Sequence, residues 1–228
     1  MKLSISMTRR EFLLGSGYLL FSMLFLPALL GLVSSLLTEP LSEALVNILY
    51  FAINFLCVAV IFRRFLWSSL KAAANKPWRC LLFAVIGFGA YMLATLIMSA
   101  VIVRIDPDFS NVNDDAIIDM AQEHTGWIAF CTVFLVPVTE ETLYRGLLFQ
   151  GLQRKSRMLA YLVSVSVFAW IHVMGYIGSF DALTLVLCFL QYLPAGAILA
   201  LAYEQTDTIV TPILIHIIIN QIGISAMR

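Results

Sequence analysis

Seven long apolar segments constrain how this chain can fold more than any other feature. Each is close to the roughly 20 residues that a helix needs to cross the hydrocarbon core of a bilayer. Of the 228 residues, 61% are hydrophobic and 12% are charged, which is far from the composition of a soluble domain. We therefore predict an all-α, polytopic integral membrane bundle of about seven to eight transmembrane helices. The segments lie at about Phe12–Leu37, Leu41–Phe62, Cys80–Val103, Trp127–Leu152, Met158–Tyr176, Ala182–Tyr203 and Ile209–Ala226.

Basic residues are concentrated in alternate connections between these segments. If the N-terminus is cytoplasmic, the inner side holds eleven of the fourteen Lys and Arg residues, at positions 2, 9, 10, 63, 64, 71, 76, 79, 154, 155 and 157. The acidic connection 104–125 then falls outside, as expected of an external loop. The positive-inside rule thus predicts seven spans with a cytoplasmic N-terminus and an external C-terminus. This pattern is compatible with a bacterial plasma membrane, where we expect the protein to reside.

The organisation of the chain indicates a single transmembrane domain, 1–228. No internal repeat, low-complexity tract or long linker divides it. We place the N-terminal spans within 12–103 and the motif-bearing core at about 127–222. Residues 63–79 are basic and contain two tryptophans, which favours an amphipathic helix on the inner leaflet, although a plain connecting loop is nearly as well supported. A formal net charge of zero gives no indication of a nucleic-acid partner.

Three charged residues interrupt the apolar segment Trp127–Leu152. A charge at the centre of a bilayer costs a few kcal/mol on insertion scales, so Glu140, Glu141 and Arg145 are candidates for a functional site. Glu141 and Arg145 stand four residues apart with the acid first, an order that allows an ion pair on one helix face. Glu140 has no such local partner. We interpret it as the reacting acid or base and the pair as its support.

Polar side chains on two later segments fall at a similar depth. Measured from the inner ends of their helices at 1.5 Å per residue, Glu140, His172 and Asn220 all lie roughly 20–22 Å into the membrane. His216 precedes Asn220 by one turn on the same face. Pro137 lacks an N–H and is expected to bend the helix just before the acidic pair. Taken singly, His172 could be a core histidine, and His216 with Asn220 could form a structural interhelical contact.

The three motifs together resemble those of the CPBP family of intramembrane proteases. They read Glu-Glu-x-x-x-Arg, Phe-x-x-x-His and His-x-x-x-Asn, starting at positions 140, 168 and 216. That family includes the type II CAAX prenyl endopeptidases and bacterial bacteriocin-processing and self-immunity proteins. The likeness covers about 127–220. It implies an eight-helix-like bundle, a water-filled active site within the membrane, and hydrolysis of a peptide bond.

The resemblance also implies a role for each motif residue. By similarity, Glu140 activates a water molecule with His172 beside it, while His216 and Asn220 stabilise the developing oxyanion. Glu141 and Arg145 would hold the site together. A zinc ion held by Glu140, His172 and His216 is the alternative. We favour catalysis without a metal or any other cofactor.

The expected partners are the lipid bilayer and a peptide or protein substrate with a membrane-proximal cleavage site. A leader peptide, a bacteriocin precursor, a signalling peptide or a CAAX-like protein would fit, whereas nucleic acid would not. The chain has no His-Glu dipeptide and no Gly-x-Ser-x-Gly, and its aspartates fall in loops or at helix ends, which argues against the other protease types. Two alternatives remain. One is a non-catalytic scaffold or immunity regulator on the same fold, and the less favoured one is a transporter.

Overall fold

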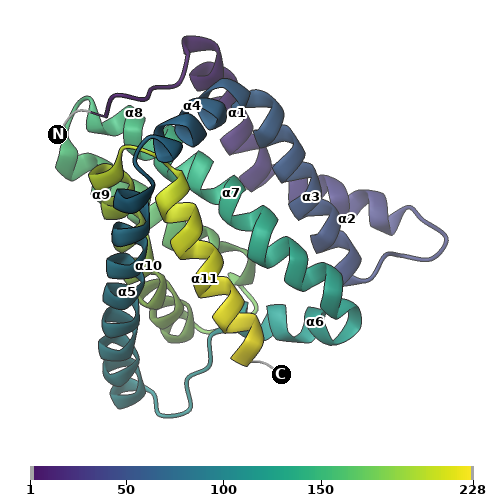
Figure 1. Ribbon diagram of the computed structural model, residues 1–228. Helices are drawn as coiled ribbons and strands as arrows, with labels where there is room; N and C mark the ends of the chain where they lie inside the picture. The colour runs from purple at the N-terminus through teal and green to yellow at the C-terminus, as the bar shows by residue number, and fades with distance from the viewer. Residues whose placement is uncertain (1–2, 227–228) are drawn as a thin grey trace.

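A computed structural model describes residues 3–226, and within that range the chain is a bundle of helices with no β-strand (Figure 1). The predicted all-α membrane bundle is therefore confirmed. The longer elements are α1 (Arg9–Leu24), α2 (Leu26–Ser35), α3 (Glu43–Ile61), α4 (Arg63–Ala74), α5 (Pro77–Ile105), α6 (Val112–Phe130), α9 (Arg157–Ile171), α10 (Ala182–Thr206) and α11 (Val210–Ala226). A 3-10 turn, η3 (Met174–Tyr176), follows α9.

The number of full-length spans is lower than predicted. Among the described residues, four helices are long and apolar enough to cross a membrane: α3, α5, Gly126–Gln153 and α10. The count becomes five if α1 and α2 are taken as one broken span, because they meet at an angle of 46°. The prediction of seven to eight spans is wrong by this measure.

Helix length explains the difference. The apolar run Met158–Tyr176 ends as a helix at Ile171, which leaves α9 with 15 residues, and α11 has 17. At 1.5 Å per residue these helices are only about 22–26 Å long, against a hydrocarbon core of about 30 Å. The first run is interrupted at Phe25, where Pro27 sits in the first turn of α2 and cannot donate a backbone hydrogen bond to α1.

The N-terminal segment and several helix ends meet at one end of the bundle. The backbone N–H of Ser4 donates to Asp207 Oδ1, between α10 and α11, at 2.9 Å. The N–H of Met7 donates to Gln150 Oε1, near the end of the long helix Gly126–Gln153, at 3.3 Å. Figure 1 shows the N-terminus, α4 and α8 at this end, with α6 and the C-terminal end of α11 at the other. The basic connections identified in the sequence therefore lie together.

The helix Gly126–Gln153 runs through the middle of the bundle, between α3 and α11 (Figure 1). Of its most apolar window, 44% is buried, against 11% for α5, so it is the least lipid-facing of the four spans. It is not a regular α-helix. After α6 it continues as η1 (Cys131–Leu135), α7 (Val136–Glu140), η2 (Glu141–Phe149) and α8 (Gln150–Gln153), in which η1 and η2 are π-helical. Pro137 was expected to bend this helix. The helix continues through Pro137, and its turns are widened on both sides of that residue.

The acidic connection predicted as an external loop is largely helical. Asn111 caps α6 by accepting hydrogen bonds from the backbone N–H groups of Asn113 and Asp114. Backbone angles at His124 (φ −134°, ψ 56°) kink the helix, which separates its acidic first part from the apolar span that follows. The composition of this segment indicated exposure to water but carried no information on its packing against α3 and α10.

Segment 63–79 contains the expected amphipathic helix, α4, although it ends at Ala74 and α5 begins at Pro77. Phe65, Ser69 and Ala73 recur every four residues and are buried, whereas Trp67 on another face is 60% exposed. Of the two alternatives for this segment, the helix is correct.

Glu11 joins α1 to the start of α4. Its Oε1 accepts hydrogen bonds from the backbone N–H groups of Arg64 at 3.1 Å and Phe65 at 2.9 Å. Its Oε2 accepts from the N–H and hydroxyl of Thr8, which completes a capping box at the start of α1. A carboxylate at a helix N-terminus satisfies free N–H groups and interacts favourably with the helix dipole. One buried acid therefore stabilises two helix starts.

We expect Glu11→Ala to weaken the docking of α1 on α4. Loss of the shared acceptor leaves two backbone donors of α4 unsatisfied, which costs on the order of 1–3 kcal/mol. Thermal unfolding in detergent should show a lower midpoint than wild type, and Arg10→Ala, a change of an exposed neighbour, should leave it unchanged. Equal midpoints for the two variants would contradict this role of Glu11.

Candidate active site

A cavity of about 380 Å³ lies beside the widened turns of the central helix. Four of the residues singled out in the sequence line it: Glu140, His172, His216 and Asn220. They come from α7, the end of α9, and α11, and together span 80 positions of the chain. The fold therefore brings the separate motifs to one hollow, with Glu141 and Arg145 fully buried next to it.

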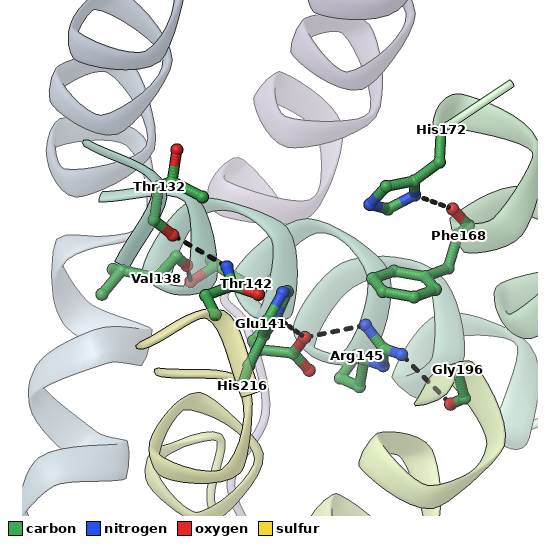
Figure 2. A network of polar contacts seen from close by, with 10 residues as sticks. Thr132, Val138, Glu141, Thr142, Arg145, Phe168, His172, Gly196 and His216 are labelled. Carbon is green, nitrogen blue, oxygen red and sulfur yellow. Dashed lines mark hydrogen bonds and ion pairs between the residues drawn. The ribbon is translucent and has the colours of Figure 1, made fainter. Parts of the chain in front are cut away.

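Glu141 is the centre of a buried polar network (Figure 2). Its Oε1 accepts hydrogen bonds from Arg145 Nη1 at 2.8 Å and from His216 Nδ1 at 2.9 Å. Arg145 also donates from Nη2 to the Gly196 carbonyl at 3.0 Å, and its guanidinium lies 4.3 Å from the centre of the Phe168 ring. The ion pair at four-residue spacing follows the sequence prediction. The contact with His216, 75 residues away, was not predicted.

The two histidines each have one ring nitrogen occupied. A carboxylate only accepts hydrogen bonds, so His216 donates from Nδ1 to Glu141 and keeps Nε2 for another partner. His172 donates from Nδ1 to the Phe168 carbonyl at 2.8 Å, as Figure 2 shows. These bonds fix the tautomer and the ring orientation. Both Nε2 atoms remain available for chemistry in the cavity.

The wide turn at η1 explains how Asn220 is held. Val136 N–H donates to the Cys131 carbonyl, five residues back, instead of to Thr132. Pro137 has no N–H to offer, so neither of these two residues occupies the Thr132 carbonyl. Asn220 Nδ2 donates to that carbonyl at 2.8 Å. The irregular helix thus provides the acceptor that orients the amide of α11, consistent with the frequent location of π-turns at functional sites.

Close packing of α9 against α10 positions the Gly196 carbonyl, which accepts a hydrogen bond from Arg145. A Cβ atom added at Gly196 would come within 3.0 Å of Val165 Cγ1 and 3.3 Å of the Phe168 ring. These contacts are tighter than ordinary van der Waals distances. A side chain at position 196 would push the two helices apart and withdraw the carbonyl that receives the guanidinium.

Glu140 differs from Glu141 in having no bond to a neighbour. Its Oε2 is buried and has no hydrogen-bond partner within residues 3–226. The residue borders the large cavity and also a smaller pocket, and Phe51 and Val136 line both as well. Glu140 is therefore the carboxylate that the structure leaves unpaired next to a hollow, as its lack of a local partner predicted.

Sequence reasoning missed Tyr192 and the residues around it. The Tyr192 ring stacks on the His172 ring, with centres 4.1 Å apart and planes 24° apart. Its hydroxyl donates to Asp114 Oδ1 at 2.8 Å and accepts from Asn113 Nδ2 at 3.0 Å. The only signal was a run of Asn and Asp at the start of α6, which we assigned to an external connection. This contact links the rim of the cavity to His172.

The zinc alternative gains no support from the geometry. Within residues 3–226, no group of three His, Cys, Asp or Glu side chains is arranged so that it could hold a metal ion. The three suggested ligands line the cavity but do not converge, and His216 already bonds to Glu141 through Nδ1. We therefore derive no step through a metal.

Comparison with known proteins adds an independent observation. Residues 122–222 match the family model described as Type II CAAX prenyl endopeptidase Rce1-like. The match covers a little under half of the chain. The matched range includes all seven motif residues, and the resemblance to CPBP proteases stated from the motifs is confirmed.

A curated relative supports the same assignment. The UPF0177 protein YbdJ of Lactococcus lactis subsp. lactis (strain IL1403) is 36% identical over 98 residues. The matched part is 42% of this chain and spans 38% of that relative's length. No solved structure matches the chain significantly. The similarity therefore concerns the motif-bearing, Rce1-like half of the protein.

We expect Arg145→Ala to reduce the amount of folded protein. Breaking a buried ion pair by removing one partner typically costs about 3–5 kcal/mol, because the other charge stays buried and uncompensated. Here Glu141 would keep only His216 as a partner. Folded yield after membrane extraction, measured by fluorescence-detected size exclusion, should fall strongly, while the exposed change Lys155→Ala should have no effect. Wild-type yield from Arg145→Ala would show that the pair is not required for folding.

Proposed function

We propose that this protein is an intramembrane endopeptidase that hydrolyses a peptide bond with a water molecule activated by Glu140. The match of residues 122–222 to the Rce1-like family supports a protease. The observation that carries the glutamate mechanism is the contrast between two adjacent acids. Glu141 is held through Oε1 by Arg145 and His216, whereas Glu140, which borders the cavity, has no hydrogen bond or ion pair to another described side chain that would hold it.

In this mechanism Glu140 acts first as a general base. It accepts a proton from water as the water oxygen attacks the carbonyl carbon of the substrate, and later gives that proton to the leaving amine. His172, whose Nε2 is free because Nδ1 donates to Phe168, accepts a hydrogen bond from the same water and orients it. Stacking of Tyr192 on His172 holds the ring in place for this task.

The oxyanion is stabilised from α11. Asn220 is anchored through one amide hydrogen to Thr132 and presents its second amide hydrogen to the cavity. His216 uses Nδ1 for Glu141, and its Nε2 donates to the oxyanion when both ring nitrogens carry a proton. Preformed donors in a site of low dielectric are effective because charge develops there only in the transition state.

Substrate and setting follow from the same reasoning. A cavity within a membrane bundle suits a peptide or protein cleaved close to the bilayer, such as a leader peptide, a bacteriocin precursor, a signalling peptide or a CAAX-like protein. We propose a bacterial plasma membrane, with the N-terminus and the basic end of the bundle on the cytoplasmic side. The proposal needs no metal, other cofactor or nucleic acid.

Glu140→Gln is the decisive variant. It keeps the size of the side chain but removes the base, so cleavage should be lost while folded yield stays at the wild-type level. Peptide profiles of membranes from cells with wild-type protein or the variant, at equal abundance, should differ by at least one processed peptide. The exposed change Glu123→Gln controls for loss of an acid. A parallel sample with a metal chelator should retain cleavage, and loss there would favour zinc.

His216→Ala and Asn220→Ala should act on the transition state more than on binding. Removal of one oxyanion donor typically lowers kcat by about 10²–10³-fold. We expect such a fall in kcat with KM changed little, measured on the peptide identified from the membrane profiles. A rise in KM with kcat preserved would instead assign these residues to substrate binding.

A further inference from the structure

A second pocket, of about 40 Å³, lies on the side of Glu140 that faces α1 and α3. Its lining is partly apolar, but six polar side chains contribute to it: Ser22, Tyr50, Asn54, Thr139, Glu140 and Tyr144. The first three belong to the N-terminal half of the chain, outside the region 122–222 that matches the protease family. The pocket therefore connects the candidate catalytic acid with a part of the protein that has no role so far.

Two buried atoms at this pocket lack partners. Glu140 Oε2 and Thr139 Oγ1 are both buried, and neither has a hydrogen bond within residues 3–226. Burial of an unpaired polar group is costly, and for an ionised carboxylate the cost is larger. Both residues line the same small pocket, so a ligand with donor and acceptor capacity placed there would satisfy both.

The polar groups from α1 and α3 are held rigidly around the pocket. Asn54 accepts a hydrogen bond from the Tyr18 hydroxyl at 2.8 Å and donates to the Tyr50 carbonyl at 2.9 Å. The Tyr50 hydroxyl donates to the Ser22 carbonyl at 3.2 Å. The Asn54 amide also bonds to the Tyr50 hydroxyl. The Thr139 hydroxyl keeps its donor and acceptor capacity, and the Ser22 hydroxyl, which donates to the Leu19 carbonyl, can still accept. The pocket thus offers both donors and acceptors.

The size of the pocket selects the ligand. A water molecule occupies about 30 Å³ in the liquid and needs two to four polar partners when buried. The pocket, of about 40 Å³, exceeds the roughly 10–15 Å³ that a cavity needs to hold one water molecule. The ligand that matches both the volume and the mixed polarity is water.

We propose that this pocket binds water against Glu140 Oε2 and supplies the water consumed in the reaction. The proposal rests on the proposed function. Hydrolysis forms a bond between the water oxygen and the carbonyl carbon, transfers one proton through Glu140 to the amine, and breaks the C–N bond, so each cycle uses one water. A bound peptide fills the large cavity and hinders entry of water from that side. Glu140 borders both spaces, so water moves past its carboxylate from the small pocket into the large one.

The experiment combines a direct view of water with kinetics. A structure of wild-type protein at a resolution that shows ordered water should contain a molecule within hydrogen-bond distance of Glu140 Oε2 and Thr139 Oγ1. Asn54→Leu, which replaces the amide with an apolar side chain, should remove it. This readout does not depend on activity, so it separates the water site from the protease assignment.

Kinetics then test the supply of water. Thr139→Val, nearly equal in volume to wild type, should lower kcat about tenfold at saturating substrate with KM unchanged, as for the loss of one ordinary hydrogen bond. Thr139→Ser should restore the rate. Thr211→Val is the matched control, since Thr211 is also buried with an unpaired hydroxyl but lines neither pocket.

Either of two results would overturn the inference. One is a wild-type pocket without ordered water, and the other is wild-type kcat in both Thr139→Val and Asn54→Leu. If Glu140→Gln abolishes cleavage in the same assay, such a result removes the water site but leaves the protease. If Glu140→Gln cleaves normally while water is seen in the pocket, the protease mechanism fails and the hydration site stands.

Discussion

The rest of the site depends on the hydrogen bonds that the Glu141 carboxylate accepts. A charge in the interior of a membrane protein is tolerated only with strong partners, and here one oxygen receives both Arg145 and His216. Those bonds tie the central helix to α11, and Arg145 extends the connection to α10 through Gly196. Because Glu141 takes these partners, its neighbour Glu140 is left without one and is available to react. In the proposed mechanism, structural and chemical roles are thus divided between adjacent acids.

Local sequence patterns predicted what depends on local geometry. The Glu141–Arg145 pair follows from helix periodicity, and the all-α membrane bundle follows from the apolar runs. Contacts between distant segments could not be predicted in this way. Examples are the bond from Asn220 to Thr132, 88 positions away, and the stacking of Tyr192 on His172. The number of spans was wrong because hydropathy reports composition, whereas the ends of α9 and α11 are set by backbone hydrogen bonds and turns.

The two halves of the chain differ in what identifies them. The motif-bearing half, 122–222, can be assigned from its sequence. The first half carries only apolar character, yet α3 packs against the central helix, and polar side chains of α1 and α3 reach the surroundings of Glu140. The first half has only a weak sequence signal because any residue of suitable size and polarity can line a small pocket. In the proposed water site, a half without a motif thus helps to line the pocket beside an acid of the other half.

Pro137 has a consequence that differs from the usual view of proline as a hinge. A regular helix uses each backbone carbonyl internally, so side chains from other helices find few acceptors within a span. With the Val136 N–H directed to Cys131 and no N–H on Pro137, the carbonyl of Thr132 is left over and receives Asn220. The imino acid thereby creates an acceptor for a partner it does not touch. Within a membrane bundle, the missing N–H of one proline can thus determine where a side chain of another helix forms a hydrogen bond.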